Sequence, residues 1–173
     1  YKRQPSDAAF RYSIGGMDAA DSVDLNSAKV LCMKRDDPCI YIKSMYWIPQ
    51  DVIDRFENDG KRQGRDNVPY QLWKDKGLLR TVPGNKVDKK VMLEWFKEIR
   101  DLEDIYILYI GYDPWHIDDS LLREFKQEFG EKSMIPVRQG VATLSNPMKD
   151  LKADLEKDLI CLLYTSPSPR DRS

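Results

Sequence analysis

An uninterrupted run of apolar and aromatic residues, Ile105 to Tyr112, lies between two polar stretches and limits the folds open to this chain. Eight residues are too few for a buried helix of ordinary length, and β-branched and aromatic side chains favour a strand. The run ends at Asp113-Pro114. A strand that is apolar throughout is typical of the centre of a covered sheet. We therefore expect a central, buried strand in a layered α/β domain.

The rest of the chain supplies strands and helices around this run. Two apolar segments around an Asp-Asp-Pro turn, with an earlier one before them, indicate a three-stranded meander at 10–18, 27–34 and 39–48. Apolar periodicity and turn residues predict the remaining elements: helices at 50–56, 69–76, 88–101, 118–129 and 147–159, a turn at 81–85, and a short strand at 134–137. The pattern is that of an α/β fold with a mixed β-sheet flanked by helices.

Length and charge exclude several classes of protein. The 173 residues are 41% hydrophobic, which suits one domain with a real core. The 28 Lys and Arg residues nearly balance the 29 Asp and Glu residues, so the chain is neither a globally basic nucleic-acid binder nor an acidic disordered segment. It has no apolar stretch long enough for a membrane span and no apolar signal core at its N-terminus.

Cysteine and histidine usage argues against thiol and zinc chemistry. An odd number of cysteines (Cys32, Cys39 and Cys161) without a signal peptide indicates reduced thiols. The sequence has no CxxC motif and a single histidine, His116, which disfavours a structural zinc site. Neither Cys32 nor Cys39 stands at a helix start where a nucleophilic thiolate would be expected. Chemistry in this chain is therefore expected to depend on carboxylates.

Two aspartates occupy strand ends. Asp18 follows the first predicted strand and Asp113 follows the apolar run. If these strands are neighbours, both carboxylates lie at one end of the sheet, where α/β sites form and where oxygen ligands suit Mg²⁺ or Mn²⁺. Asp21 and Asp24 are in reach for secondary or loop roles. The alternative from spacing alone is that these aspartates only form turns and helix caps.

Other polar residues have two interpretations each. His116 is either a solvent-facing loop residue or a general base or ligand. A basic loop contains Lys61, Arg62 and Arg65. It either binds DNA phosphates or is an ordinary solvated loop. Arg138 and Gln139 precede a glycine near the predicted sheet edge, where we expect them to contact DNA.

Five ordered sequence blocks carry a family resemblance. They are Gly-Met-Asp…Asp-Leu-Asn-Ser-Ala at 16–28, Tyr-Trp-Ile-Pro at 46–49, Val-Pro-Tyr-Gln-Leu-Trp…Thr-Val-Pro-Gly-Asn-Lys-Val-Asp at 68–88, Gly-Tyr-Asp-Pro-Trp at 111–115, and Gln-Gly…Thr-Leu-Ser…Pro…Lys at 139–149. Together they resemble the nuclease domain of tailed-phage terminase large subunits. Ala19-Ala20 stands where the family usually has Leu-Ser, which leaves the neighbouring carboxylate in place.

The resemblance implies an RNase H-like fold and a two-metal endonuclease that cuts concatemeric double-stranded viral DNA during genome packaging. It makes Asp18 and Asp113 catalytic ligands of two Mg²⁺ or Mn²⁺ ions. It also implies a third aspartate after the last predicted helix, and an ATP-driven motor domain before residue 1. The expected partners are DNA, the portal protein and the small terminase subunit, in the host cytoplasm and away from membranes.

The final thirteen residues do not continue the charged, amphipathic helical pattern of the residues before them. Residues 161–173 resemble the translation of a sequencing-library adapter. We expect a nuclease domain at 1–160, truncated at both ends, without its ATPase domain or its third carboxylate, and therefore weak or inactive.

Two competing interpretations remain at this point. One is another RNase H-like nuclease of the resolvase or transposase type, which shares the carboxylate chemistry but not the block at 68–88. The other is a catalytically silent DNA- or portal-binding module in which the aspartates only cap turns.

Overall fold

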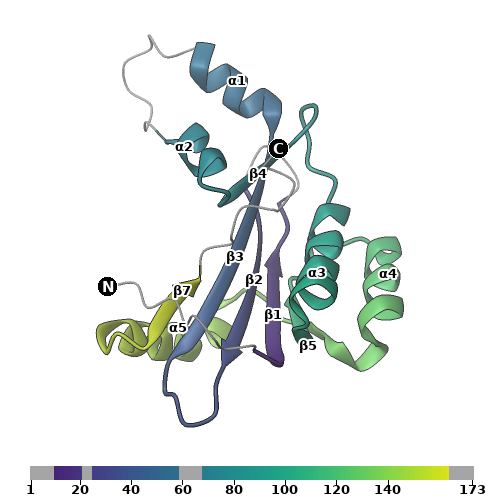
Figure 1. The fold of residues 1–173 in the computed structure, drawn as a ribbon. Coiled ribbons are helices and arrows are strands. Elements are labelled where there is room, and N and C mark those ends of the chain that lie inside the picture. The colour runs from purple at the N-terminus through teal and green to yellow at the C-terminus, as the bar shows by residue number, and fades with distance from the viewer. Residues whose placement is uncertain (1–9, 21–24, 59–67, 164–173) are drawn as a thin grey trace.

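The computed structural model describes residues 10–20, 25–58 and 68–163. Its elements are, in chain order, β1 (Tyr12–Asp18), β2 (Asn26–Met33), β3 (Ile40–Pro49), α1 (Gln50–Asn58), α2 (Tyr70–Asp75), β4 (Leu79–Val82), α3 (Lys90–Glu103), β5 (Tyr106–Tyr112), α4 (Asp119–Phe129), the 3₁₀ turn η1 (Glu131–Ser133), β6 (Met134–Pro136), α5 (Val141–Glu156) and β7 (Ile160–Leu163). The described strands form one mixed sheet in the order β4-β3-β2-β1-β5-β6, and β7 pairs with the outer edge of β3 (Figure 1). The predicted α/β class with a mixed sheet is confirmed.

Strands β1, β2 and β3 form the predicted antiparallel meander. The turn between β2 and β3 is held by a carboxylate: Asp37 accepts hydrogen bonds from the backbone N–H of Cys39 (2.9 Å) and the hydroxyl of Tyr41 (2.7 Å). Asp36 has a φ of 62°, a left-handed conformation that Asp adopts more readily than most residues. Short-range turn chemistry therefore sets this hairpin.

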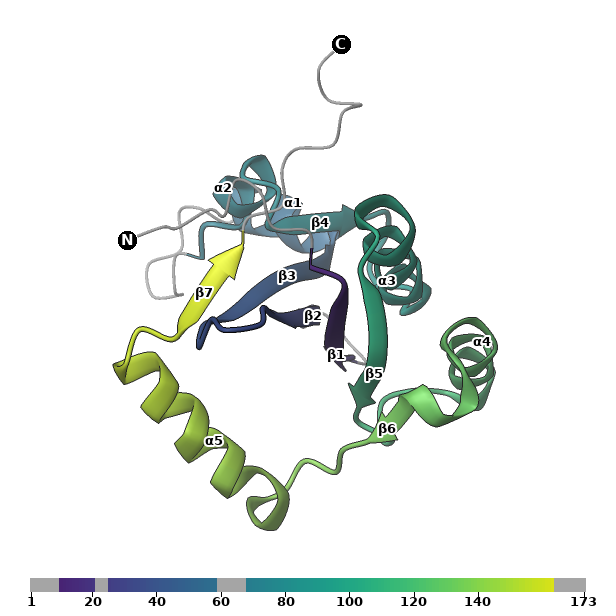
Figure 2. The same ribbon diagram turned by 60° about the horizontal axis from the view of Figure 1, so that its bottom comes forward.

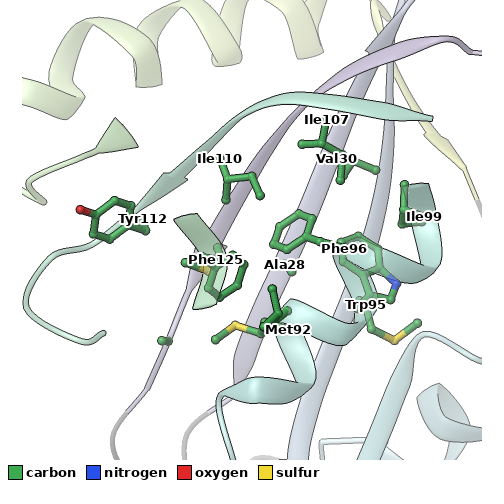
Figure 3. Packing of buried hydrophobic residues seen from close by; sticks show 14 of the residues in the cluster. Ala28, Val30, Met92, Trp95, Phe96, Ile99, Ile107, Ile110, Tyr112 and Phe125 are labelled. Carbon is green, nitrogen blue, oxygen red and sulfur yellow. The ribbon is translucent and has the colours of Figure 1, made fainter. Parts of the chain in front are cut away.

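One face of the sheet is covered by α3 and α4. Helix α3 connects β4 to β5, and its buried Trp95 and Phe96 lie against the sheet (Figure 3). Phe125 of α4 is fully buried beside Phe96, with ring centroids 6.2 Å apart in an edge-on arrangement. The alternation of β2 sends Ala28 and Val30 into this same core. The main hydrophobic core thus lies between the sheet and these two helices.

The other face of the sheet is largely uncovered. Figure 2 shows α5 on the side of the sheet opposite α3 and α4, and no residue of α5 is buried. Tyr106, Leu108 and Tyr109 of β5 are about half exposed, at 53%, 45% and 50%. The expectation that this strand is buried on both faces is therefore wrong. The strand is also not central, since it lies between β1 and the short outer strand β6, and no element among the described residues covers this face of it.

Two predicted elements have different boundaries. The segment predicted as a turn at 81–85 begins as β4, because Leu79 to Val82 pair in parallel with the end of β3. The last long helix was expected from Pro147 but starts at Val141, so Pro147 lies inside it. Inside a helix a proline removes one hydrogen bond and crowds the carbonyl four residues earlier, so Pro147 was expected at the helix start, and α5 contains it at an energetic cost.

Strand β7 crosses the boundary at which the adapter-like segment was predicted to begin. Ile160 to Leu163 pair in parallel with Ile40 to Lys43, and Leu159 accepts a hydrogen bond from the backbone N–H of Ile40 (2.8 Å). Residues 164–173 lie outside the described part of the chain. The adapter interpretation of the tail stays a prediction.

Candidate active site

Asp18 ends β1 on the uncovered face of the sheet. In β1 the buried residues alternate with exposed ones, and Asp18 falls on the exposed side with Tyr12, Ile14 and Gly16. The chain after Asp18 is held by Asn26, a fully buried side chain whose Oδ1 accepts a hydrogen bond from the backbone N–H of Ala20 (3.0 Å). A buried amide that accepts from the backbone thus positions the exit of the strand that carries the carboxylate.

Asp113 follows β5 directly and is 8% exposed. Its Oδ1 accepts a hydrogen bond from the backbone N–H of Trp115 (3.0 Å), and its backbone carbonyl accepts one from His116 (3.3 Å). These two bonds form the local turn that an Asp-Pro sequence favours. Asp113 therefore does form a turn, as the alternative interpretation predicted, and the turn uses Oδ1 of its carboxylate.

The sheet brings the two aspartates together. Strands β1 and β5 are parallel neighbours, with Gly16 opposite Gly111 and Met17 opposite Tyr112. Asp18 and Asp113 each come two residues after the paired glycines, at the carboxyl ends of strands that lie about 4.8 Å apart. The prediction that these aspartates close adjacent strands is confirmed.

The carboxylate oxygens of Asp18 and Asp113 are ligands that fit a hard divalent cation. Asp18 accepts a hydrogen bond from the side-chain amide of Gln139 (3.3 Å), and in the described ranges no Lys or Arg forms an ion pair with Asp18 or Asp113. Mg²⁺ is commonly held by one or two carboxylates and several waters. No group of three or more potential metal ligands occurs among the residues described. The site therefore offers two carboxylates, which is enough to fit such an ion but short of the expected three.

The remaining predicted residues divide into two groups. His116 is half-buried near the site, and its backbone carbonyl accepts a hydrogen bond from the ammonium of Lys89 (2.6 Å). Arg138 is exposed beside Gln139. The other predicted residues lie outside the described part of the chain: Asp21, Asp24, Lys61, Arg62 and Arg65.

From the sequence, Gln139 was predicted to contact DNA, and its bond to Asp18 was not predicted. The two residues are 121 positions apart. No short-range signal connects them, because β6 brings Gln139 to the sheet end only through its parallel pairing with β5.

The mixed sheet in the order β4-β3-β2-β1-β5-β6, with helices packed against it, is an RNase H-like fold. The comparisons with known proteins identify the family. The model of the terminase large subunit endonuclease domain matches residues 5–161. The chain belongs to this family.

Two comparisons with a single phage protein agree with this assignment. The terminase large subunit of Enterobacteria phage HK97 is 31% identical over 103 residues, which are 60% of this chain and 19% of that protein. The crystal structure of the HK97 large terminase has the same fold, with a TM-score of 0.65 at 21% identity over 88% of this chain and 30% of the other. The chain thus spans less than a third of the relatives it matches. None of its described helices has the length and apolar character needed to cross a lipid bilayer.

Proposed function

We propose that this domain is a Mg²⁺- or Mn²⁺-dependent endonuclease that cuts concatemeric double-stranded DNA during viral genome packaging. The observation that carries the proposal is the pair Asp18 and Asp113, placed at the carboxyl ends of adjacent parallel strands in a member of the terminase endonuclease family. Phosphodiester hydrolysis by two-metal sites depends on carboxylates in such a place.

The residues of the chain have distinct parts in this proposal. Asp18 and Asp113 would hold the ions, which when bound supply Lewis-acid stabilisation of charge on the phosphodiester and activation of the attacking water. The N–H of Trp115 fixes the orientation of the Asp113 carboxylate through Oδ1. Gln139 donates to Oδ1 of Asp18 and limits its rotation. Preorganised ligands need no rearrangement when the substrate arrives.

The parent protein supplies the rest of the proposed activity. A third carboxylate is expected from the resemblance, and among the described residues no group of three potential metal ligands occurs. We therefore propose that the described residues alone cleave DNA weakly or not at all. We further infer an ATP-driven motor domain elsewhere in the parent protein, with the portal protein and the small terminase subunit as partners in the host cytoplasm.

The first test is metal binding by the chain. Calorimetric titration with Mn²⁺ should give heat with the unsubstituted chain, and Asp18→Asn and Asp113→Asn should each weaken binding at least tenfold, because loss of one of two carboxylates removes half of the protein ligands. In the parent protein the same substitutions should abolish Mn²⁺-dependent plasmid cleavage.

Asp75→Asn is the matched control. Asp75 lies at the end of α2, which packs on β4 at the far edge of the sheet, and an asparagine can still accept the bond from Gln71. Its binding heat should equal that of the unsubstituted chain. Absence of Mn²⁺ heat from the unsubstituted chain would instead support a silent DNA- or portal-binding module.

A further inference from the structure

A lysine on the uncovered sheet face is held in place by two hydroxyl groups. The ammonium of Lys29 in β2 donates hydrogen bonds to the hydroxyls of Tyr46 (2.6 Å) and Ser44 (3.2 Å), and it lies 4.5 Å from the centroid of the Tyr46 ring. Both hydroxyls are neutral, so they orient the cation without compensating its charge. Lys29 forms no ion pair with any acidic side chain that the structure describes.

The register of the sheet places this cation next to the two aspartates. Gly16 is opposite Lys29, and Asp18 is opposite Ser27, so Asp18 and Lys29 are diagonal neighbours on the same face. Diagonal neighbours on one face lie about 7–8 Å apart, which a long side chain can span. The Lys29 ammonium instead bonds to Ser44 and Tyr46 on the side away from Asp18, so a ligand over β1 could contact both Lys29 and Asp18.

The sheet positions next to Lys29 on β1 and β5 are both glycine. Gly16 and Gly111 are paired on β1 and β5, and a Cβ atom added at Gly16 would meet nothing within 4 Å. One added at Gly111 would meet Cγ2 of Val137 at 3.4 Å and the backbone oxygen of Gly15 at 3.9 Å, both ordinary contact distances. Packing within the protein therefore does not explain why both positions are glycine. A DNA backbone that lies close against the sheet would explain it, because a side chain at either position would keep that backbone away.

We propose that Lys29 is a phosphate-positioning residue, which contacts a phosphate of the DNA backbone beside the scissile position while the strand passes over Gly16 and Gly111. Ser44 and Tyr46 accept from two of the three ammonium donors, and with the partners that the described residues offer, one donor remains for a phosphate oxygen. The inference deepens the proposed nuclease function and rests on double-stranded DNA being the substrate.

The test measures DNA binding without metal, so that it does not depend on the aspartates. A short fluorescein-labelled duplex is titrated with the 173-residue chain in EDTA over a series of salt concentrations, and binding is followed by anisotropy. Loss of one phosphate contact should lower the slope of log Kobs against log salt by about 0.9 and weaken binding severalfold at low salt. We expect both effects for Lys29→Gln.

Three further variants separate positioning from folding. Lys29→Met keeps the alkyl chain over the Tyr46 ring and removes the charge, so it should behave as Lys29→Gln. Lys29→Arg should restore the slope. Lys97→Gln, on α3 at the covered face, removes a lysine that is already paired with Glu94 and should leave binding unchanged. Thermal melts show which variants are folded.

An unchanged slope in folded Lys29→Met or Lys29→Gln would overturn the inference, and so would a lack of salt-dependent DNA binding by the unsubstituted chain. Failure of the proposed nuclease function is seen separately, as the absence of Mn²⁺ heat. A normal metal titration with an unchanged salt slope therefore rejects the role of Lys29 alone.

Discussion

Two adjacent glycines in β1 have opposite reasons for being glycine. A Cβ atom at Gly15 would lie 2.9 Å from Cε1 of Phe96, closer than real Cβ atoms approach, and 3.2 Å from Cγ1 of Ile110, a distance tighter than most real contacts. At Gly16 the same atom would meet open space. The first glycine thus lets α3 pack against the sheet, and the second keeps the uncovered face flat beside Asp18.

The difference predicts opposite effects of the same substitution. Gly15→Ala should lower the free energy of unfolding by about 1–3 kcal/mol, the usual effect of overpacking, because the Phe96 ring is fully buried and has little room to move. Gly16→Ala should leave stability unchanged or raise it slightly, since a strand alanine loses less backbone entropy than a glycine. Urea unfolding of both variants checks this, and equal stabilities would contradict the packing argument.

The β2–β3 hairpin is the element whose stability should respond most simply to pH. The backbone N–H of Cys39, and then the hydroxyl of Tyr41, hold the pKa of Asp37 below its ordinary value. A carboxyl group whose pKa is lowered in the folded state stabilises the fold above its unfolded pKa, about 3.9. That contribution is lost as the pH falls from there through the folded value.

Asp37→Asn should therefore be less stable than the unsubstituted chain near pH 7, and the difference should shrink as the pH falls below about 4. Urea midpoints at neutral and acid pH measure it. Asp36→Asn is the matched control, because asparagine also adopts the left-handed conformation that Asp36 has at a φ of 62°. A difference that persists unchanged at acid pH would show that the Asp37 charge has no part in the turn.

Across the whole molecule, the buried contacts are concentrated between the sheet and the helices α3 and α4. Helix α3 contributes five buried residues to the core, whereas the 16-residue helix α5 contributes none. Apolar side chains of α5 remain open to solvent, including Met148 at 61% and Leu155 at 55%. A helix without a buried face depends on its own propensity, which is marginal for a segment of this length.

Hydrogen exchange should show this division. Amides of α5 should exchange through local opening, much faster than those in the middle of α3, which should open only with global unfolding. Exchange of the chain followed by mass spectrometry gives both rates in one experiment. Equal protection of the two helices would mean that α5 packs on a surface of its own.

The sequence alone determined the elements that depend on short-range interactions. Alternation and turn residues were enough for the β1–β2–β3 meander, amphipathic periodicity for α3 and α4, and the apolar run for β5. The ordered motifs were enough for the family, and the strand-end positions of Asp18 and Asp113 were enough to predict that they would meet. Each of these signals lies within a few residues of the chain, where side-chain pattern and backbone preference act directly.

Only the tertiary structure decided which distant segments are neighbours and which surfaces are covered. The half-exposed face of β5, the donation from Gln139 to Asp18 and the position of Lys29 beside Gly16 all follow from strand order and register. Alternation in β2 shows that Lys29 points away from the core, but it does not say which strand lies beside it. Register is set by packing and hydrogen bonds between segments far apart in sequence, and the energy of those contacts exists only once the chain is folded.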